Sequence, residues 1–365
     1  MTINWRIGIE IELLAPLGKS RLDLANAIAQ FHNGTVRRFF HPQSEPSKVP
    51  STPIFHNLTL GYEILDDRQE CIAQCVDDLT LQADLIRKSV PKPGWYRIIS
   101  DDERLLRLIG RQADPSQPLQ TVLNPIGDLF GTATHSGPGG MVGLNDEMGA
   151  SVAIAAPLPG ERERPCELIT APLESNHQEQ LESLLSLARS LGFTAPVEGA
   201  THIHFDASRL QSADAIANLI QLLWTYGEAL KQLMGTNPNC RRLGQWPDAL
   251  LETIASPDFR SLAWPEAQSR LQQVDLTKYC DFNLVNYIRN IPNKNTIEIR
   301  ILPVWLESQP LLEAAALFAA ILERSVESPP ILTASVQKDT QATIKTLLEM
   351  LPLSAIQQDY WRREI

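Results

Sequence analysis

The chain has 365 residues, of which 43% are hydrophobic and 21% charged, so it can bury a sizeable core and is not globally disordered. Its net charge of −11 argues against a general surface for nucleic acid or anionic membranes, because such surfaces need clustered Lys and Arg. No apolar run is long enough to span a bilayer and the N-terminus lacks a signal-peptide pattern, so we expect a soluble cytoplasmic protein. The five cysteines lack the paired spacing of a zinc site and are expected to be reduced structural thiols.

The first predicted strand, residues 8–12, alternates isoleucine with glutamate. This period of two places Glu10 and Glu12 on one face of a half-buried strand. Two interpretations follow. The face is the polar surface of an ordinary sheet, or it lines a cleft in which a divalent cation removes the repulsion between the carboxylates.

The first half of the chain contains further predicted elements and one glycine-rich segment. Residues 132–143 carry four glycines without the ending of a phosphate-binding loop, which favours a flexible loop or lid. The following elements are predicted in chain order: a helix from Ser20 to near Gly34, an irregular excursion over 41–53, a strand over 55–65, a helix over 68–87, a strand over 95–99, a helix starting at 101–103, an irregular stretch over 112–145, and a hairpin of strands 150–158 and 166–173.

The second half combines two strands with several helices. The predicted elements are a helix that begins after Ser175 and ends at Gly192, a strand over 200–206, a long apolar helix over 212–234, a helical segment up to 273, a strand over 296–301, and helices over 311–324 and 340–351.

Ionisable residues recur on four of these strands. They are Glu10 with Glu12, Glu167, His202 with His204, and Glu298 with Arg300. Each pair has a spacing of two, so both side chains share a face while the intervening isoleucine points to the other. Carboxylates and imidazoles are suitable donors for Mg²⁺ or Mn²⁺, so together the strands indicate a metal-binding sheet surface.

The same strands resemble, in order, the motifs of the amidoligase family, which is grouped with glutamine synthetase and glutamate-cysteine ligase among the carboxylate-amine ligases. The resemblance rests on residues 8–12 (GIEIE), 166–173 (CELITAPL), 201–204 (THIH) and 296–300 (TIEIR). It implies an α+β, glutamine synthetase-like fold: a curved antiparallel sheet with helices on one face and an open catalytic cleft on the other. Residues 1–305 would form the catalytic domain, with an irregular insertion at about 41–145, and 306–365 a C-terminal helical extension.

The resemblance also implies a role for each ionisable residue. Glu10 and Glu12 would hold two different divalent ions, with Glu167 as a further carboxylate ligand and His202 as the ligand histidine. His204 would lie near phosphate or substrate. Glu298 would bind metal beside the nucleotide phosphates, and Arg300 would steady the transferred phosphoryl group.

The residue types suit amide-bond formation driven by ATP with Mg²⁺ or Mn²⁺. ATP can activate a carboxylate as an acyl phosphate, which an amine then attacks, and cations neutralise charge during phosphoryl transfer. We expect an acid and an amine or peptide as substrates, no nucleic acid or membrane partner, and leave a homo-oligomer open. Arginine pairs bidentately with carboxylate, so the weaker candidates for substrate contacts, each equally compatible with a structural role, are Arg162, Arg164, Asn286 and Arg289.

Three alternatives remain at this point. His202 and His204 also resemble the metal-binding strand of amidohydrolases, which predicts a metal-dependent hydrolase, but that fold needs further histidines downstream and none follows position 204. The second alternative is a non-catalytic nucleotide- or metal-binding protein that kept the fold. The third is a phosphotransferase with a stable phosphorylated product.

Overall fold

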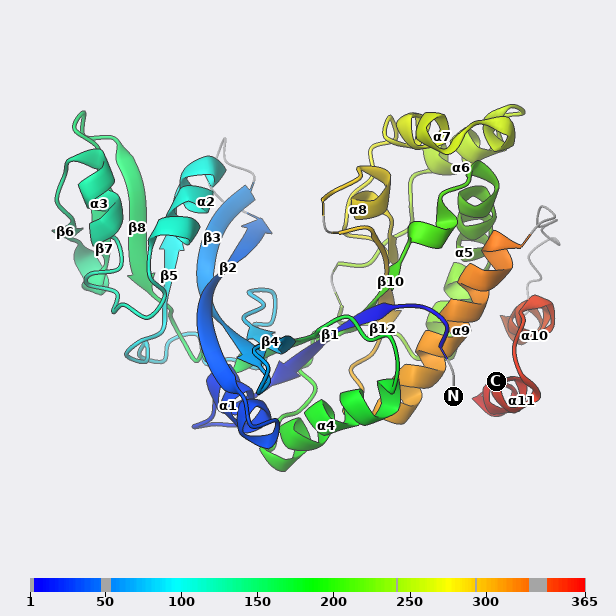
Figure 1. The fold of residues 1–365 in the computed structure, drawn as a ribbon, viewed down its shortest axis with the longest axis horizontal. Coiled ribbons are helices and arrows are strands. Elements are labelled where there is room, and N and C mark those ends of the chain that lie inside the picture. Colours follow the sequence, from blue (N-terminus) through cyan, green and yellow to red (C-terminus); the bar gives the residue numbers. More distant parts are fainter. Residues whose placement is uncertain (1–2, 47–53, 241, 293, 328–339, 365) are drawn as a thin grey trace. The chain divides into compact units, whose positions relative to one another are not determined.

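A computed structural model describes residues 3–46, 54–240, 242–292, 294–327 and 340–364 (Figure 1). The chain is an α+β protein with a large antiparallel sheet and helices, as the sequence predicts. It forms two compact units, which are described separately. Unit 1 comprises Met1–Glu10, Pro172–Leu185 and Gly199–Ile365, and unit 2 comprises Ile11–Ala171 and Ser186–Glu198.

The sheet of unit 1 has the strand order β11-β12-β10-β1, with only the part of β1 up to Glu10 belonging to this unit. Asn283 and His204 both pair with Glu298, from the two sides of β12, and both pairings are antiparallel. The isoleucines between the polar residues are buried, so one sheet face packs in the core and the other carries the ionisable side chains. The bounds are β1 Ile7–Leu14, β10 Thr201–Asp206, β11 Phe282–Asn283 and β12 Thr296–Leu302.

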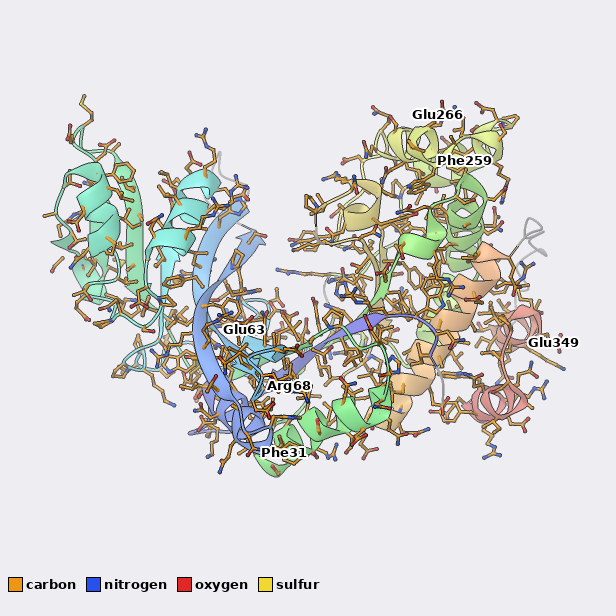
Figure 2. The ribbon with its side chains drawn as sticks, viewed as in Figure 1. Phe31, Glu63, Arg68, Phe259, Glu266 and Glu349 are labelled. Atoms are coloured by element: carbon orange, nitrogen blue, oxygen red, sulfur yellow. The ribbon has the colours of Figure 1, made fainter. Side chains whose placement is uncertain are left out.

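Helices α5 and α9 pack against each other in unit 1 (Figure 1). Helix α5 is capped at its N-terminal end by Ser212, whose side chain accepts from the N–H of Ala215, and at its C-terminal end by Gly235 in the left-handed conformation (φ 64°). Phe259, labelled in Figure 2, is fully buried in a short 3₁₀ turn that contacts α5 and α6. The helices are α4 His177–Ser190, which ends in unit 2, α5 Ala213–Met234, α6 Asp248–Ala255, α7 Trp264–Leu271, α8 Val285–Ile288, α9 Ser308–Val326, α10 Thr340–Met350 and α11 Ala355–Glu364.

The sheet of unit 2 has the order β1-β9-β4-β3-β5-β8-β7-β6, and β2 pairs along β3. Helices α2 and α3 cover one face of this sheet around a buried apolar cluster that includes Leu58, Leu106 and Ile126. The strands are β2 Thr35–Pro46, β3 Ile54–Leu65, β4 Cys71–Val76, β5 Tyr96–Ile99, β6 His135–Ser136, β7 Val142–Asn145, β8 Ser151–Pro157 and β9 Pro165–Thr170, and the helices are α1 Arg21–Phe31, α2 Glu103–Gln112 and α3 Asn124–Phe130.

Three predictions for unit 2 are wrong. The predicted helix over 68–87 is instead the strand β4 followed by turns, because β4 pairs with β3 on one side and β9 on the other. Strands β8 and β9 exist but form no hairpin with each other, since β8 pairs with β5 and β7 and β9 pairs with β4. The irregular insertion at 41–145 is largely ordered: β2 extends through 41–46, strands and helices follow it, and 47–53 lie outside the described residues.

The other predicted strands and helices are confirmed, and β2, β11, α8 and α11 are among the elements that the sequence did not indicate. The glycine-rich segment forms the short β6–β7 hairpin, with Gly139 and Gly140 at positive φ in its turn. Within the described ranges, no helix is both long and apolar enough to traverse a bilayer. The division at 305 into a catalytic domain and a helical extension stays a prediction.

Candidate metal centre

Four ionisable side chains from three neighbouring strands meet in unit 1. We call Glu10, His202, His204 and Glu298 the histidine–carboxylate cluster. The backbone N–H of Asp206 donates to the carbonyl of Arg6, and a Cβ placed on Gly8 would lie 3.8 Å from the Cβ of His204. From the first contact to the second, the residue number rises along β1 and falls along β10, so the two strands are antiparallel. Continuing this register places Glu10 beside the histidines.

The histidines link the two carboxylates of the cluster. Nδ1 of His202 lies 3.3 Å from Oε2 of Glu10 and 3.4 Å from Oε1 of Glu298. Nε2 of His204 lies 3.1 Å from Oε1 of Glu10, while its Nδ1 lies 3.3 Å from the hydroxyl of Thr296. His202 and Glu298 are each only 5% exposed, so water screens these charges weakly.

Burial and charge act in opposite directions on the pKa values of the cluster. Burial alone would raise the pKa of Glu10, but the charge of His204 and the hydrogen bond of His202 outweigh it and hold this pKa well below its usual value. Burial likewise acts to raise the pKa of Glu298, and the positive charges of the two histidines and Arg300 lower it. Burial acts to lower the pKa of His204, but the charge of Glu10 raises it to about 8.

Two further residues of unit 1 contact the carboxylate of Glu298. The guanidinium of Arg300 donates through Nη1 to Oε1 of Glu298. The side-chain amide of Asn283 donates to Oε2 over 2.7 Å. Both oxygens of this carboxylate therefore have defined partners, and its orientation is fixed.

The donor set of the cluster suits a divalent cation. Glu10, His204 and Glu298 each offer one ligand atom, and these atoms all lie within 4.8 Å of one another. Two carboxylates held this close repel each other, which the charges of His204 and Arg300 offset in the metal-free protein. A cation bound by oxygen and imidazole donors would offset the same repulsion. The resemblance placed His204 near phosphate, whereas in unit 1 it is also a candidate metal ligand.

A second group of acids lies within unit 2, and we call it the acidic cluster. Ligand oxygens of Glu12, Asp78 and Glu167 lie within 4.8 Å of one another. Glu12 comes from β1 and Glu167 from β9. Glu167 pairs with Val76, the last residue of β4, and Asp78 follows two residues later, so it lies close to Glu167. Three carboxylate oxygens are the ligands that Mg²⁺ and Mn²⁺ prefer.

The four weaker candidates for substrate contacts lie in different surroundings. Arg162 is 7% exposed and donates to Asp77 and to the carbonyls of Asp78 and Leu81, and Arg164 donates to Glu161 and the carbonyl of Ala15. These contacts suit a structural role. Asn286 is half-buried on α8, and the exposed Arg289 donates to the carbonyl of Leu276. A substrate role stays a prediction for all four.

Two residues of these sites were missed in the sequence. Asp78 directly follows Asp77 in a segment whose apolar residues predict a helix, and only its position after the central strand β4 identifies it. Asn283 comes from a strand of two residues, too short to show a pattern. The sequence analysis instead predicted a substrate contact for Asn286, three residues later.

The chain is therefore an α+β protein whose sheet strands carry two clusters of candidate ligands for divalent cations. The chain belongs to the family described as "Putative amidoligase enzyme", whose model matches residues 3–322. This range includes both clusters and ends within α9, so α10 and α11 lie beyond it. No curated protein matches the chain.

Proposed function

We propose that the protein is an ATP- and Mg²⁺- or Mn²⁺-dependent carboxylate-amine ligase that forms an amide bond through an acyl phosphate. Membership of the amidoligase family suggests an amide-bond ligase. The observation that carries the finer proposal is the convergence of Glu10, His204 and Glu298 within 4.8 Å, with Arg300 bonded to Glu298. We expect the substrates to be a small acid and an amine, such as amino acids or a peptide.

The proposed reaction has two steps. An oxygen of the substrate carboxylate attacks the γ-phosphorus of ATP, the bond from that phosphorus to the bridging oxygen breaks, and ADP leaves. The amine nitrogen then attacks the acyl carbon, inorganic phosphate leaves with the electrons of the C–O bond, and the nitrogen loses a proton to a base. The products are an amide, ADP and phosphate.

The residues of unit 1 have separate tasks in this scheme. A divalent cation held by Glu10, His204 and Glu298 would neutralise charge on the phosphoryl oxygens. Arg300 contributes a permanent positive charge beside the same carboxylate, since guanidinium does not deprotonate in proteins. The acidic cluster of unit 2 would hold a second cation through Glu12, Asp78 and Glu167.

The test is product formation by the purified protein with ATP, Mg²⁺ and pools of acids and amines. ADP and phosphate should appear only when both an acid and an amine are present, and mass spectrometry should detect the acid and amine joined with loss of water. ATP-independent cleavage of an amide would instead indicate the hydrolase. A phosphorylated product that persists with amine present would indicate the phosphotransferase.

A matched pair of variants tests the site. Glu298→Gln keeps the size of a side chain that is 5% exposed but removes its charge, and should abolish amide formation. Glu266→Gln makes the same change on α7, where Glu266, labelled in Figure 2, is exposed, and should leave the rate unchanged. Equal rates in both variants would remove Glu298 from the mechanism.

A further inference from the structure

Asn283 is a buried asparagine directly beside the histidine–carboxylate cluster. It is 3% exposed and pairs with Glu298 across the β11–β12 ladder. Its Nδ2 donates to Oε2 of Glu298 over 2.7 Å. An amide placed this way can hold a carboxylate in one orientation without adding charge.

The orientation of the Asn283 amide is set by the backbone that follows it. The N–H of Val285 donates to Oδ1 of Asn283 over 2.9 Å, in a turn at the start of α8. A backbone N–H can only donate, so the atom facing it must be the amide oxygen. The NH₂ group therefore faces Glu298, which accepts when ionised.

This bond leaves Glu298 able to bind a cation. Its Oε2 accepts from Asn283, while Oε1 accepts from Arg300 and lies 3.4 Å from Nδ1 of His202. Each carboxylate oxygen has two lone pairs, so one hydrogen bond fixes the rotation of the group and still leaves room for a metal. Hydrogen-bond partners of metal-ligating carboxylates typically contribute about 10- to 100-fold to metal affinity.

We propose that Asn283 is a positioning residue for the histidine–carboxylate cluster. Its amide holds the Glu298 carboxylate in the orientation in which Glu298 joins Glu10 and His204 as a ligand set. The proposal rests on the proposed function in one respect, namely that a divalent cation binds at this cluster. Asn283 itself contacts neither metal nor substrate in this scheme.

The decisive variant is Asn283→Asp, which separates two roles of the side chain. Aspartate keeps the oxygen that accepts from Val285, so the turn into α8 is preserved. It replaces the NH₂ donor with an oxygen that faces Oε2 of Glu298, where two acceptors repel. Asn283→Ser is a second variant, since serine can cap the same turn but is too short to reach Glu298.

Asn237 offers a matched control in the same unit. Its Oδ1 accepts from the N–H of Asn239 over 3.0 Å, and its Nδ2 donates to the carbonyl of Gly199 over 2.8 Å. The arrangement is the same two-residue turn, but the amide donates to a backbone carbonyl instead of a cluster carboxylate. Asn237→Asp therefore measures how much stability an Asn-to-Asp substitution costs in this kind of turn away from the cluster.

The measurements are Mn²⁺ affinity by isothermal titration calorimetry and unfolding in urea, on the full chain. We expect Asn283→Asp and Asn283→Ser to bind Mn²⁺ about 10- to 100-fold more weakly, and Asn237→Asp to bind as wild type does despite a similar loss of stability. Wild-type affinity in both Asn283 variants, with Glu298→Gln binding weakly, would overturn the role of Asn283 alone. No effect of Glu10→Gln or Glu298→Gln on Mn²⁺ affinity would overturn the proposed metal centre as well.

Discussion

The imidazole of His204 lies 3.1 Å from the carboxylate of Glu10, and this ion pair links strand β10 to strand β1. The pKa of His204 is about 8, above its ordinary value of 6.5, so the ring is mostly protonated at neutral pH. The metal-free protein thus carries its own cation in the position where a metal would bind. This relationship makes the cluster sensitive to pH.

We predict that the metal-free protein loses stability as the pH rises through 8. A folded-state pKa above the unfolded value means that protonation of His204 stabilises the fold. This stabilisation is fully present below pH 6.5 and is lost as the pH rises through about 8. The shift corresponds to a loss of about 2 kcal/mol at most. Urea unfolding between pH 6 and 9, with chelator present, measures it. His204→Gln should remove most of this slope; an unchanged slope would assign it to another group.

Removal of Asp78 should abolish one cation site and leave the other. Asp78→Asn keeps the oxygen that accepts from the N–H of Thr80 but weakens the acidic cluster of unit 2. We expect the Mn²⁺ stoichiometry to fall from two to one, with unchanged affinity at the remaining site. Asp66→Asn is the control, because Asp66 caps a similar turn through the N–H groups of Arg68 and Glu70. A stoichiometry of two in both variants would contradict the prediction.

A larger side chain at Gly8 should strengthen the strand and weaken the site. The Cβ of an alanine would lie 3.8 Å from that of His204, which is ordinary contact, so no backbone strain requires glycine here. Gly8→Ala should stabilise the fold by about 0.5 kcal/mol or more. Gly8→Val should add branched methyl groups on the face that Gly8 shares with Glu10. We expect higher thermal stability but weaker Mn²⁺ binding in Gly8→Val, and near-normal binding in Gly8→Ala.

Substitution of Arg162 should destabilise the protein by about 3–5 kcal/mol, because it leaves the buried carboxylate of Asp77 without its closest charge partner. Arg162→Met tests this through urea unfolding. The control is Arg104→Met, since the side chain of Arg104 is 83% exposed in its pair with Asp102 and should contribute little to stability. A stable Arg162→Met protein with weakened substrate binding would contradict the structural role and support Arg162 as a substrate contact.

The sequence predicts the strands in which apolar and ionisable residues alternate clearly, and it fails where the apolar residues of a strand also fit a helical spacing. Alternation identified β1, β10 and β12 and hence Glu10, His204 and Glu298. Strand β4 was predicted as part of a helix because Ile72, Cys75 and Val76 have helical spacing, whereas in the structure it is a central strand that pairs with β3 and β9. Neighbouring predicted strands β8 and β9 were likewise paired with each other, although their partners come from distant parts of the chain.

The candidate site was only partly predictable for the same physical reason. Motif residues could be matched one by one, but Asp78 and Asn283 have roles that depend on which strand lies next to theirs. Asn283 faces Glu298 only because β11 pairs with β12 in one register. Short segments specify such registers through tertiary packing rather than through their own pattern.

Strand β1 contributes Glu10 to unit 1 and Glu12 to unit 2, with the fully buried Ile11 between them. Successive residues of a strand alternate between faces, so deletion of Ile11 would turn one of the two glutamates into the core. Substitutions elsewhere can alter either cluster alone, but a change of length within β1 disrupts at least one of them. Insertions and deletions in this segment should therefore be excluded during the evolution of the family, even where point substitutions are accepted.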